Sequence, residues 1–168
     1  MPPPLTPIER PYQAPERQPK LSRWVRGVLA GMALGLIAVF CLAVWIRPYD
    51  EDGRPKRMET HLQLGLPPCH FRYLTGVPCP SCGMTTSFSL LMHGDPVNSL
   101  KANAVGTCLA IYLLAMIPWC LGSALRGRSI YIVAFDRAVT WTVIVFLSLM
   151  LTRWAIVLCW GWLSGNGF

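Results

Sequence analysis

The chain has 168 residues, of which 53% are hydrophobic and only 14% are charged, and its formal net charge is +7. Soluble domains carry about a quarter charged residues, so this composition argues against a soluble globule. The basic residues flank apolar runs and form no stripe with aromatic platforms, which argues against nucleic-acid binding. We therefore expect an integral membrane protein whose surroundings are a lipid bilayer.

Residues 1–22 are predicted to form a disordered, proline-rich cytoplasmic tail. Seven prolines fall within residues 1–20, and such a segment cannot bury enough apolar surface to fold alone. A docking arm for a partner protein is the alternative interpretation. Residues 23–168 are then a single membrane domain.

Three apolar segments are long enough to cross a bilayer, at about residues 27–46, 97–121 and 138–160. The first is an uncharged run of twenty residues, and such a helix rises about 30 Å, one hydrocarbon thickness. Arg153 interrupts the third segment, and a helix from Arg137 rises roughly 24 Å before reaching it, which places it in the far third of the bilayer. The sequence predicts an all-α integral membrane protein with three transmembrane helices.

Glycines recur at every fourth position of the first span, at Gly27, Gly31 and Gly35. Such a stripe permits close helix packing with another membrane protein, although glycine is also common in membrane helices generally. Four cysteines within apolar spans are expected to be small core residues; they are Cys41, Cys108, Cys120 and Cys159.

The distribution of lysine and arginine gives the orientation. If the N-terminus is cytoplasmic, eight basic residues lie inside and six outside, apart from Arg153 within the bilayer. The positive-inside rule then favours a cytoplasmic N-terminus and places the loop before the second span on the outer face.

That loop holds the most distinctive chemistry, in residues 69–94. Cys69 is followed by Cys79 and Cys82, with Pro78 and Pro80 restricting the backbone between them. Residues 81–93 show helical periodicity, so Cys79 and Cys82 are expected at the N-terminus of a short interfacial or re-entrant helix, where a thiolate is favoured. Residues 95–96, Asp-Pro, are predicted to be the N-cap and first position of the second span.

Three interpretations of the cysteines remain open. Cys79 and Cys82 fit a redox dithiol, although the βαβ context typical of such a motif is absent. With Cys69 and either His70 or His61, they also fit a site for zinc or another soft metal, with His70 the preferred histidine. Alternatively, they hold the outer loop against the helix of a scaffold. The sequence shows no catalytic triad, carboxylate pair or phosphate loop, so we expect an accessory subunit or small binding module rather than an enzyme.

The motif resembles a known family. Cys69, the Leu-Thr-Gly-Val-Pro stretch at residues 74–78, the Cys-Pro-Ser-Cys-Gly-Met-Thr stretch at 79–85 and the Gly-Asp pair at 94–95 are similar to the domain of unknown function 2752 family of small bacterial membrane proteins. The resemblance implies a multi-pass protein of the bacterial inner membrane and no established reaction. Thr86 stands where the family pattern usually has arginine, and Ala104 follows Asn103 where the pattern often has proline.

Further residues are expected to support the motif. They are Gly83, Thr85, Thr86, Asp95, Lys101, Asn103 and Arg153. Because Thr86 carries no charge, Lys101 or, in preference, Arg153 is a candidate to point inward and hydrogen-bond the motif helix or its ligand. The alternative is that Arg153 extends to the lipid headgroups.

Overall fold

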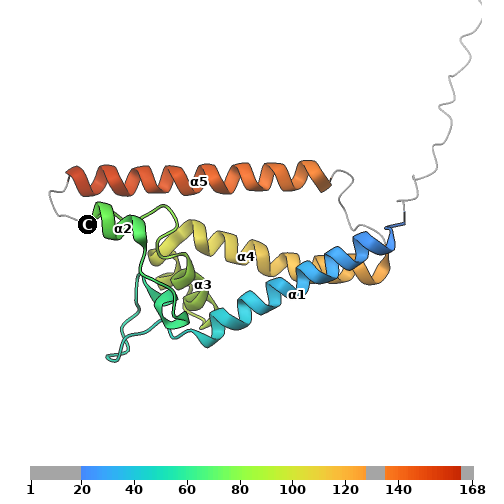
Figure 1. The fold of residues 1–168 in the computed structure, drawn as a ribbon, viewed down its shortest axis with the longest axis horizontal. Helices are drawn as coiled ribbons and strands as arrows, with labels where there is room; N and C mark the ends of the chain where they lie inside the picture. The colour runs from blue at the N-terminus through green and yellow to red at the C-terminus, as the bar shows by residue number, and fades with distance from the viewer. Residues whose placement is uncertain (1–19, 128–134, 164–168) are drawn as a thin grey trace, which may run out of the picture.

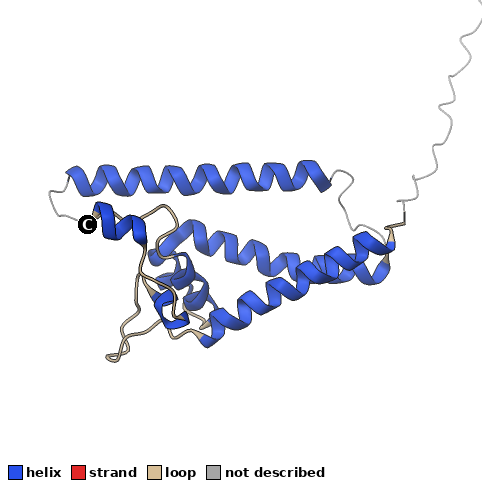
Figure 2. Ribbon diagram, in the orientation of Figure 1, coloured by secondary structure: helices blue, strands red, loops and turns tan. Residues whose placement is uncertain are grey.

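The structure, a computed structural model, describes residues 20–127 and 135–163; of Phe135 and Asp136 it describes only the backbone. The described part is helical and holds no strand, and Tyr49 and Pro55 form an isolated bridge (Figures 1 and 2). Its elements are α1 (Arg23–Trp45), the 3₁₀ helix η1 (Thr60–Leu64), α2 (His70–Thr75), α3 (Met84–Met92), α4 (Pro96–Arg126) and α5 (Phe135–Leu163). The proline-rich tail falls outside the described residues up to residue 19.

Among the described residues, three helices are long and apolar enough to span a membrane: Arg23–Trp45, Pro96–Arg126 and Arg137–Leu163. The predicted all-α membrane fold is therefore confirmed. α1 begins where the sequence supplies a cap, since the Ser22 hydroxyl accepts a hydrogen bond from the Val25 amide at 3.3 Å. α4 also begins as predicted, with Asp95 as the N-cap and Pro96 at the first turn.

The long helices alternate in direction, and the short elements gather at one end of them. α1 and α5 run one way and α4 runs back between them (Figure 1). η1, α2 and α3 lie where α1 ends and α4 begins. The cysteine segment and the start of α1 are therefore at opposite ends of the molecule.

α3 packs against α1 and α4 at this end. The rings of Phe40 in α1 and Phe88 in α3 stack with centroids 5.7 Å apart. Serine hydroxyls of α3 and α4 bond backbone carbonyls across the contact: Ser89 donates to Ile46 and Ser99 donates to Ser87, at 2.8 and 2.7 Å. These bonds satisfy polar groups that would be costly to bury alone.

The connection at residues 47–77 is more structured than the solvated loop that its charges indicate. It contains both η1 and α2. α3 begins at Met84, after a turn at residues 80–83, rather than at Ser81. Short helices of this kind depend on tertiary contacts, which periodicity within five or six residues cannot reveal.

α4 is broken near its start, at Asn103. The backbone there has φ −157° and ψ 101°, which is not helical. The Asn103 side-chain oxygen accepts a hydrogen bond from the Gly106 amide at 3.0 Å, as an N-cap does. Asn103 thus ends one helical segment and caps the next, without the proline that usually produces such a break.

Most of the cysteines and the repeated glycines of the spans face outward. Of the four cysteines expected in the core only Cys120 is buried, and the expectation is wrong for Cys41, Cys108 and Cys159, which are exposed on the helices and face the surroundings. Gly27, Gly31 and Gly35 also face outward, and a Cβ added to any of them meets no described atom within 4 Å. Packing of this stripe against another membrane protein stays a prediction.

Candidate functional site

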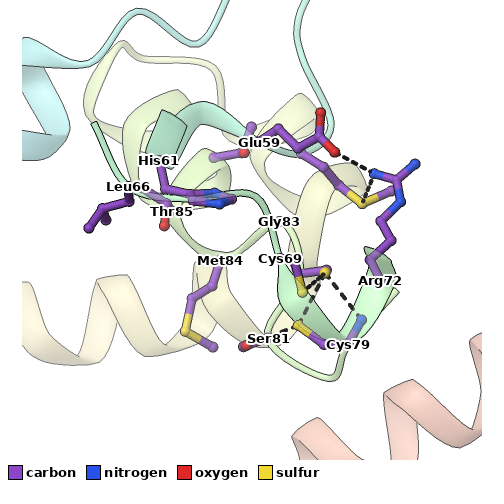
Figure 3. A pocket seen from close by; sticks show the side chains of 13 residues that line it. Glu59, His61, Leu66, Cys69, Arg72, Cys79, Ser81, Gly83, Met84 and Thr85 are labelled. Carbon is purple, nitrogen blue, oxygen red and sulfur yellow. Dashed lines mark hydrogen bonds and ion pairs between the residues drawn. The ribbon is translucent and has the colours of Figure 1, made fainter. Parts of the chain in front are cut away.

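The fold brings three cysteine sulfurs together. The Sγ atoms of Cys69, Cys79 and Cys82 all lie within 4.8 Å of one another. The Cys79 and Cys82 sulfurs are 3.1 Å apart, and those of Cys82 and Cys69 are 3.8 Å apart. Figure 3 shows the thiols of Cys69 and Cys79 at the edge of one cavity. Two segments separated by ten residues of sequence therefore supply one site.

The backbone around Cys79 is folded onto the Cys82 sulfur. The Cys79 amide donates to that sulfur at 3.1 Å, while the Cys82 amide donates to the Cys79 carbonyl at 3.0 Å. Cys69 is the N-cap residue of α2 and comes from a separate segment of the chain. The three thiols are thus held by a tight turn and by the start of a helix.

Gly83 makes this turn possible. Its φ is +82°, and a Cβ at this position would lie 2.8 Å from the Ala102 carbonyl oxygen and 3.0 Å from that of Arg57. A side chain would be strained by the backbone angle and would also collide with backbone atoms. Glycine therefore lets the Cys82 turn press directly against the break in α4.

The two cysteines of the turn differ in acidity. Burial acts to raise the pKa of Cys79, but hydrogen bonds from Ser81, Cys82 and Cys69 outweigh it, so this pKa lies below its ordinary value of 9.0. Burial and the hydrogen bond to Cys79 raise the pKa of Cys82 to about 12. Cys79 is therefore the more acidic of the two thiols, and Cys82 is hydrogen-bonded to it.

The thiols open on a cavity of about 330 Å³. It is lined by Met58, Glu59, His61, Leu66, Cys69, Arg72, Cys79, Ser81, Cys82, Gly83, Met84, Thr85 and Thr86. Arg72 of α2 pairs with Glu59 at 2.9 Å on the cavity wall (Figure 3). Thiols, thioethers and an imidazole share this space, and all of these are ligands for soft or borderline metals.

The histidines are placed differently from the sequence-based preference. His70 is the first residue of α2 and is exposed, and it does not line the cavity. His61, the other histidine considered, lies on η1 and does line it. Backbone adjacency of His70 to Cys69 therefore does not bring its side chain to the thiols.

The expected supporting residues fall into two groups. Thr85 and Thr86 line the cavity, and Thr86, where the resemblance leads us to expect arginine, is buried and hydrogen-bonded to Thr60 at 3.0 Å. Asp95 caps α4 and Lys101 is exposed, so neither side chain lines the cavity.

The side chains of Asn103 and Arg153 both form hydrogen bonds at the break in α4, next to the turn that carries Cys82. The Asn103 amide donates to the Cys82 carbonyl at 3.2 Å. Because the Gly106 amide bonds the Asn103 side chain, the Ala102 carbonyl is available to the half-buried Arg153 guanidinium, which donates to it at 3.2 Å. Arg153 therefore points inward, and its hydrogen bond goes to α4 rather than to α3.

Trp154 is a site residue that the sequence does not single out, because tryptophans near the end of a membrane span are typical of an interfacial aromatic belt. Its indole donates to the Pro78 carbonyl at 2.8 Å, and its ring contacts Phe71 of α2 with centroids 6.0 Å apart. Trp160 and Trp162 are exposed, as belt residues are. The one sequence signal for a role of Trp154 was its position next to Arg153. These two neighbouring residues of α5 each donate a hydrogen bond to a backbone carbonyl at the site, that of Ala102 or of Pro78.

A comparison with protein-family models supports the resemblance of the cysteine motif. Residues 69–117 match the family described as "Protein of unknown function (DUF2752)", which confirms the resemblance inferred from the motif. No curated protein and no solved structure matches the chain significantly. The match covers all three clustered cysteines and the first part of α4.

Proposed function

We propose that this protein is a small membrane-bound metal-binding module, in which Cys69, Cys79 and Cys82 hold a zinc ion at the membrane surface as part of a larger membrane assembly. The observation that carries the proposal is the convergence of three sulfurs within 4.8 Å. A tetrahedral zinc–thiolate site has Zn–S bonds of about 2.3 Å, which separates its sulfurs by about 3.8 Å. The Cys82–Cys69 separation is 3.8 Å and the Cys79–Cys82 separation is 3.1 Å, so small shifts would suffice.

The third cysteine favours metal over a simple disulfide. A disulfide would use only Cys79 and Cys82, whereas Cys69 is brought to Cys82 from a separate helix. The lowered pKa of Cys79 favours its thiolate, and metal binding would release the protons that the three thiols still carry. Metal affinity should therefore rise with pH.

The test measures metal and thiols together. The full chain, purified in detergent under reducing conditions, is expected to carry one zinc per chain by elemental analysis. Cys69→Ser, Cys79→Ser and Cys82→Ser should each lose it, while Cys159→Ser, which changes an exposed cysteine of α5, should keep it. Metal-free wild-type protein that also takes up no added zinc would contradict the proposal.

Thiol–disulfide exchange is the second candidate, and the 3.1 Å separation of the Cys79 and Cys82 sulfurs favours it. In this reaction the Cys79 thiolate attacks a disulfide of a partner protein and forms a mixed disulfide, releasing one partner thiolate. Cys82 loses its proton and displaces the second partner sulfur, so the partner is reduced and Cys79–Cys82 is oxidised. Cys82→Ser would then trap the partner on Cys79, which gel electrophoresis without reductant would detect.

The two candidates exclude each other at any moment, because zinc needs reduced thiolates. If the cysteine variants lose no metal and trap no partner, the motif is a structural element of a scaffold.

A further inference from the structure

His61 is the histidine that the fold brings to the thiol cavity. Zinc in structural sites takes four ligands, and three cysteines with one histidine form an established set. Among the described residues, the clustered sulfurs supply three. We infer that His61 is the fourth ligand, so that the site is a closed Cys₃His centre; this inference rests on the proposed zinc function.

η1 is fixed to the segments that carry the cysteines. Thr60, adjacent to His61, is buried at 1% exposure, and its hydroxyl lies 3.0 Å from the hydroxyl of Thr86 on α3. Glu59, on the other side of Thr60, pairs with Arg72 of α2, the helix that begins after Cys69. The 3₁₀ helix is thereby anchored both to the helix after Cys82 and to the helix after Cys69.

A third attachment holds the far end of η1. The Gln63 side chain accepts a hydrogen bond from the Arg47 amide at 3.0 Å and donates to the Arg47 carbonyl at 2.7 Å. Arg47 follows the end of α1. With its backbone fixed at three points, η1 presents His61 to the cavity at little further entropic cost.

The imidazole of His61 lines the same cavity as the three sulfurs but lies outside their cluster. His61 lines the cavity, and Figure 3 shows its ring extending into it, whereas its nitrogens do not belong to the group of ligand atoms within 4.8 Å. Ligation therefore requires the imidazole to rotate towards the sulfurs about the two side-chain torsions of His61. A metal ion supplies the attraction for this closure.

The other donors fit less well. His70 is exposed outside the cavity, and the Nδ1 atom of His93 lies 2.8 Å from the Ser89 carbonyl on α3. Met58 accepts a hydrogen bond from Arg72 at 3.8 Å, and thioethers select copper(I) rather than zinc. Glu59 also lines the cavity, but its carboxylate is paired with Arg72 at 2.9 Å. His61 is therefore the remaining described donor in the cavity whose chemistry suits zinc.

Cobalt(II) tests the assignment, because its absorption spectrum reports the number of thiolate ligands. Reduced full-length protein in detergent is titrated with cobalt and then with zinc in competition. His61→Ala should weaken zinc binding by at least about tenfold and shift the cobalt d–d bands, while His93→Ala should leave both unchanged. His61→Cys should restore affinity and increase the thiolate-to-cobalt charge-transfer band, which shows that the loss is not misfolding.

The outcomes separate this inference from the proposed function. If His61→Ala keeps the affinity and spectrum of the wild type while the cysteine variants lose metal, the inference is overturned and the zinc function stands. If His70→Ala causes the loss instead, His70 is the ligand and the inference is also overturned. A wild-type protein that binds neither cobalt nor zinc overturns both.

Discussion

Gly83 lies between the Cys82 turn and the broken part of α4. Its positive φ and the 2.8 Å approach of an added Cβ to the Ala102 carbonyl both oppose a side chain. Gly83→Ala should therefore lower the free energy of unfolding by about 1–3 kcal/mol, seen as a lower melting temperature in detergent. Gly94→Ala is the matched control, because Gly94 has φ +77° but open space around it. Equal losses in both variants would show that the close approach contributes nothing.

The acidity of Cys79 gives a pH-dependent prediction. Its pKa is lowered from 9.0, so its thiolate should persist below that pH and disappear only as pH falls through the lowered value. The alkylation rate of Cys79 in reduced, metal-free protein should accordingly show a midpoint below 9.0, whereas Cys82, with a pKa of about 12, should stay unreactive across neutral pH. Mass spectrometry of iodoacetamide-treated peptides measures both rates.

Ser81 provides the check on that mechanism. Its hydroxyl lies 3.3 Å from the Cys79 sulfur and helps to lower the pKa of Cys79. Ser81→Ala should move the alkylation midpoint of Cys79 upward. A midpoint that does not move, or a wild-type midpoint at or above 9.0, would contradict this account.

At the residue scale, the sequence predicted local chemistry better than long-range placement. The Cys79–Cys82 pair and the Asp95 cap depend on neighbours within a few residues, and spacing reveals such contacts. His70 was preferred as a ligand because it adjoins Cys69, but consecutive residues on a helix point to different sides. The bond between Thr60 and Thr86 spans 26 positions, and nothing in the local pattern indicates it.

Among the elements, α4 is the one whose irregularity positions the site. Asn103 both caps the Gly106 segment and donates to the Cys82 carbonyl. Asn103→Ala should remove both and cost about 2–3 kcal/mol, a cap and one net hydrogen bond. Asn103→Ser keeps a capping oxygen but cannot reach Cys82, so it should recover about 1 kcal/mol. Thermal unfolding in detergent distinguishes these, and equal melting temperatures for the two variants would refute the capping role.

α5 is connected to the site by Arg153. This guanidinium donates to the Ala102 carbonyl, and a charged hydrogen bond of this kind contributes about 1.5–3 kcal/mol. Arg153→Met retains the length and apolar stem but removes the donor, so it should lower the melting temperature and speed alkylation of Cys79. Arg137→Met, at an exposed position at the other end of α5, is the control. If the two variants behave alike, Arg153 serves only as a lipid anchor.

The elements differ in whether the local sequence or contacts between distant residues determine them. The three spans follow from uninterrupted apolar length, which composition alone reveals. The break at Asn103 was not predicted, because asparagine in a helix is usually tolerated. Its capping role here depends on the close approach of the Gly83 backbone to Ala102, which the local sequence does not reveal. η1 and α2 were missed because six residues or fewer cannot form a helix without tertiary support.

On the scale of the whole molecule, the described contacts of α5 with the rest fall in its middle, between Thr142 and Trp154. Tyr112 of α4 and Phe146 of α5 lie with ring centroids 5.7 Å apart, and Trp154 bonds the Pro78 carbonyl. Much of its apolar surface is exposed, including Trp141, Ile144 and Leu151. Lipid would cover this surface in a membrane, which removes the cost that water would impose.

The alternation of helix directions ties the cysteine site to the orientation of the chain. Because the start of α1 and the site lie at opposite ends of the bundle (Figure 1), a cytoplasmic N-terminus requires an outer-face site. That orientation is proposed from the positive-inside rule, with eight basic residues inside and six outside. Location on the outer face would also determine the oxidation state of the three cysteines, because thiols there are oxidised unless a metal or a reductant protects them.

Epitope tags test the orientation without altering a cysteine. One tag is inserted after Gly53, in the exposed turn before the site, and another after Gly127, at the end of α4. In intact spheroplasts of a bacterial host, antibody should bind the Gly53 tag alone, and permeabilisation should expose the Gly127 tag as well. Binding of the Gly127 tag in intact cells would reverse the topology and place the three cysteines in the reducing cytoplasm, where zinc binding needs no protection from oxidation.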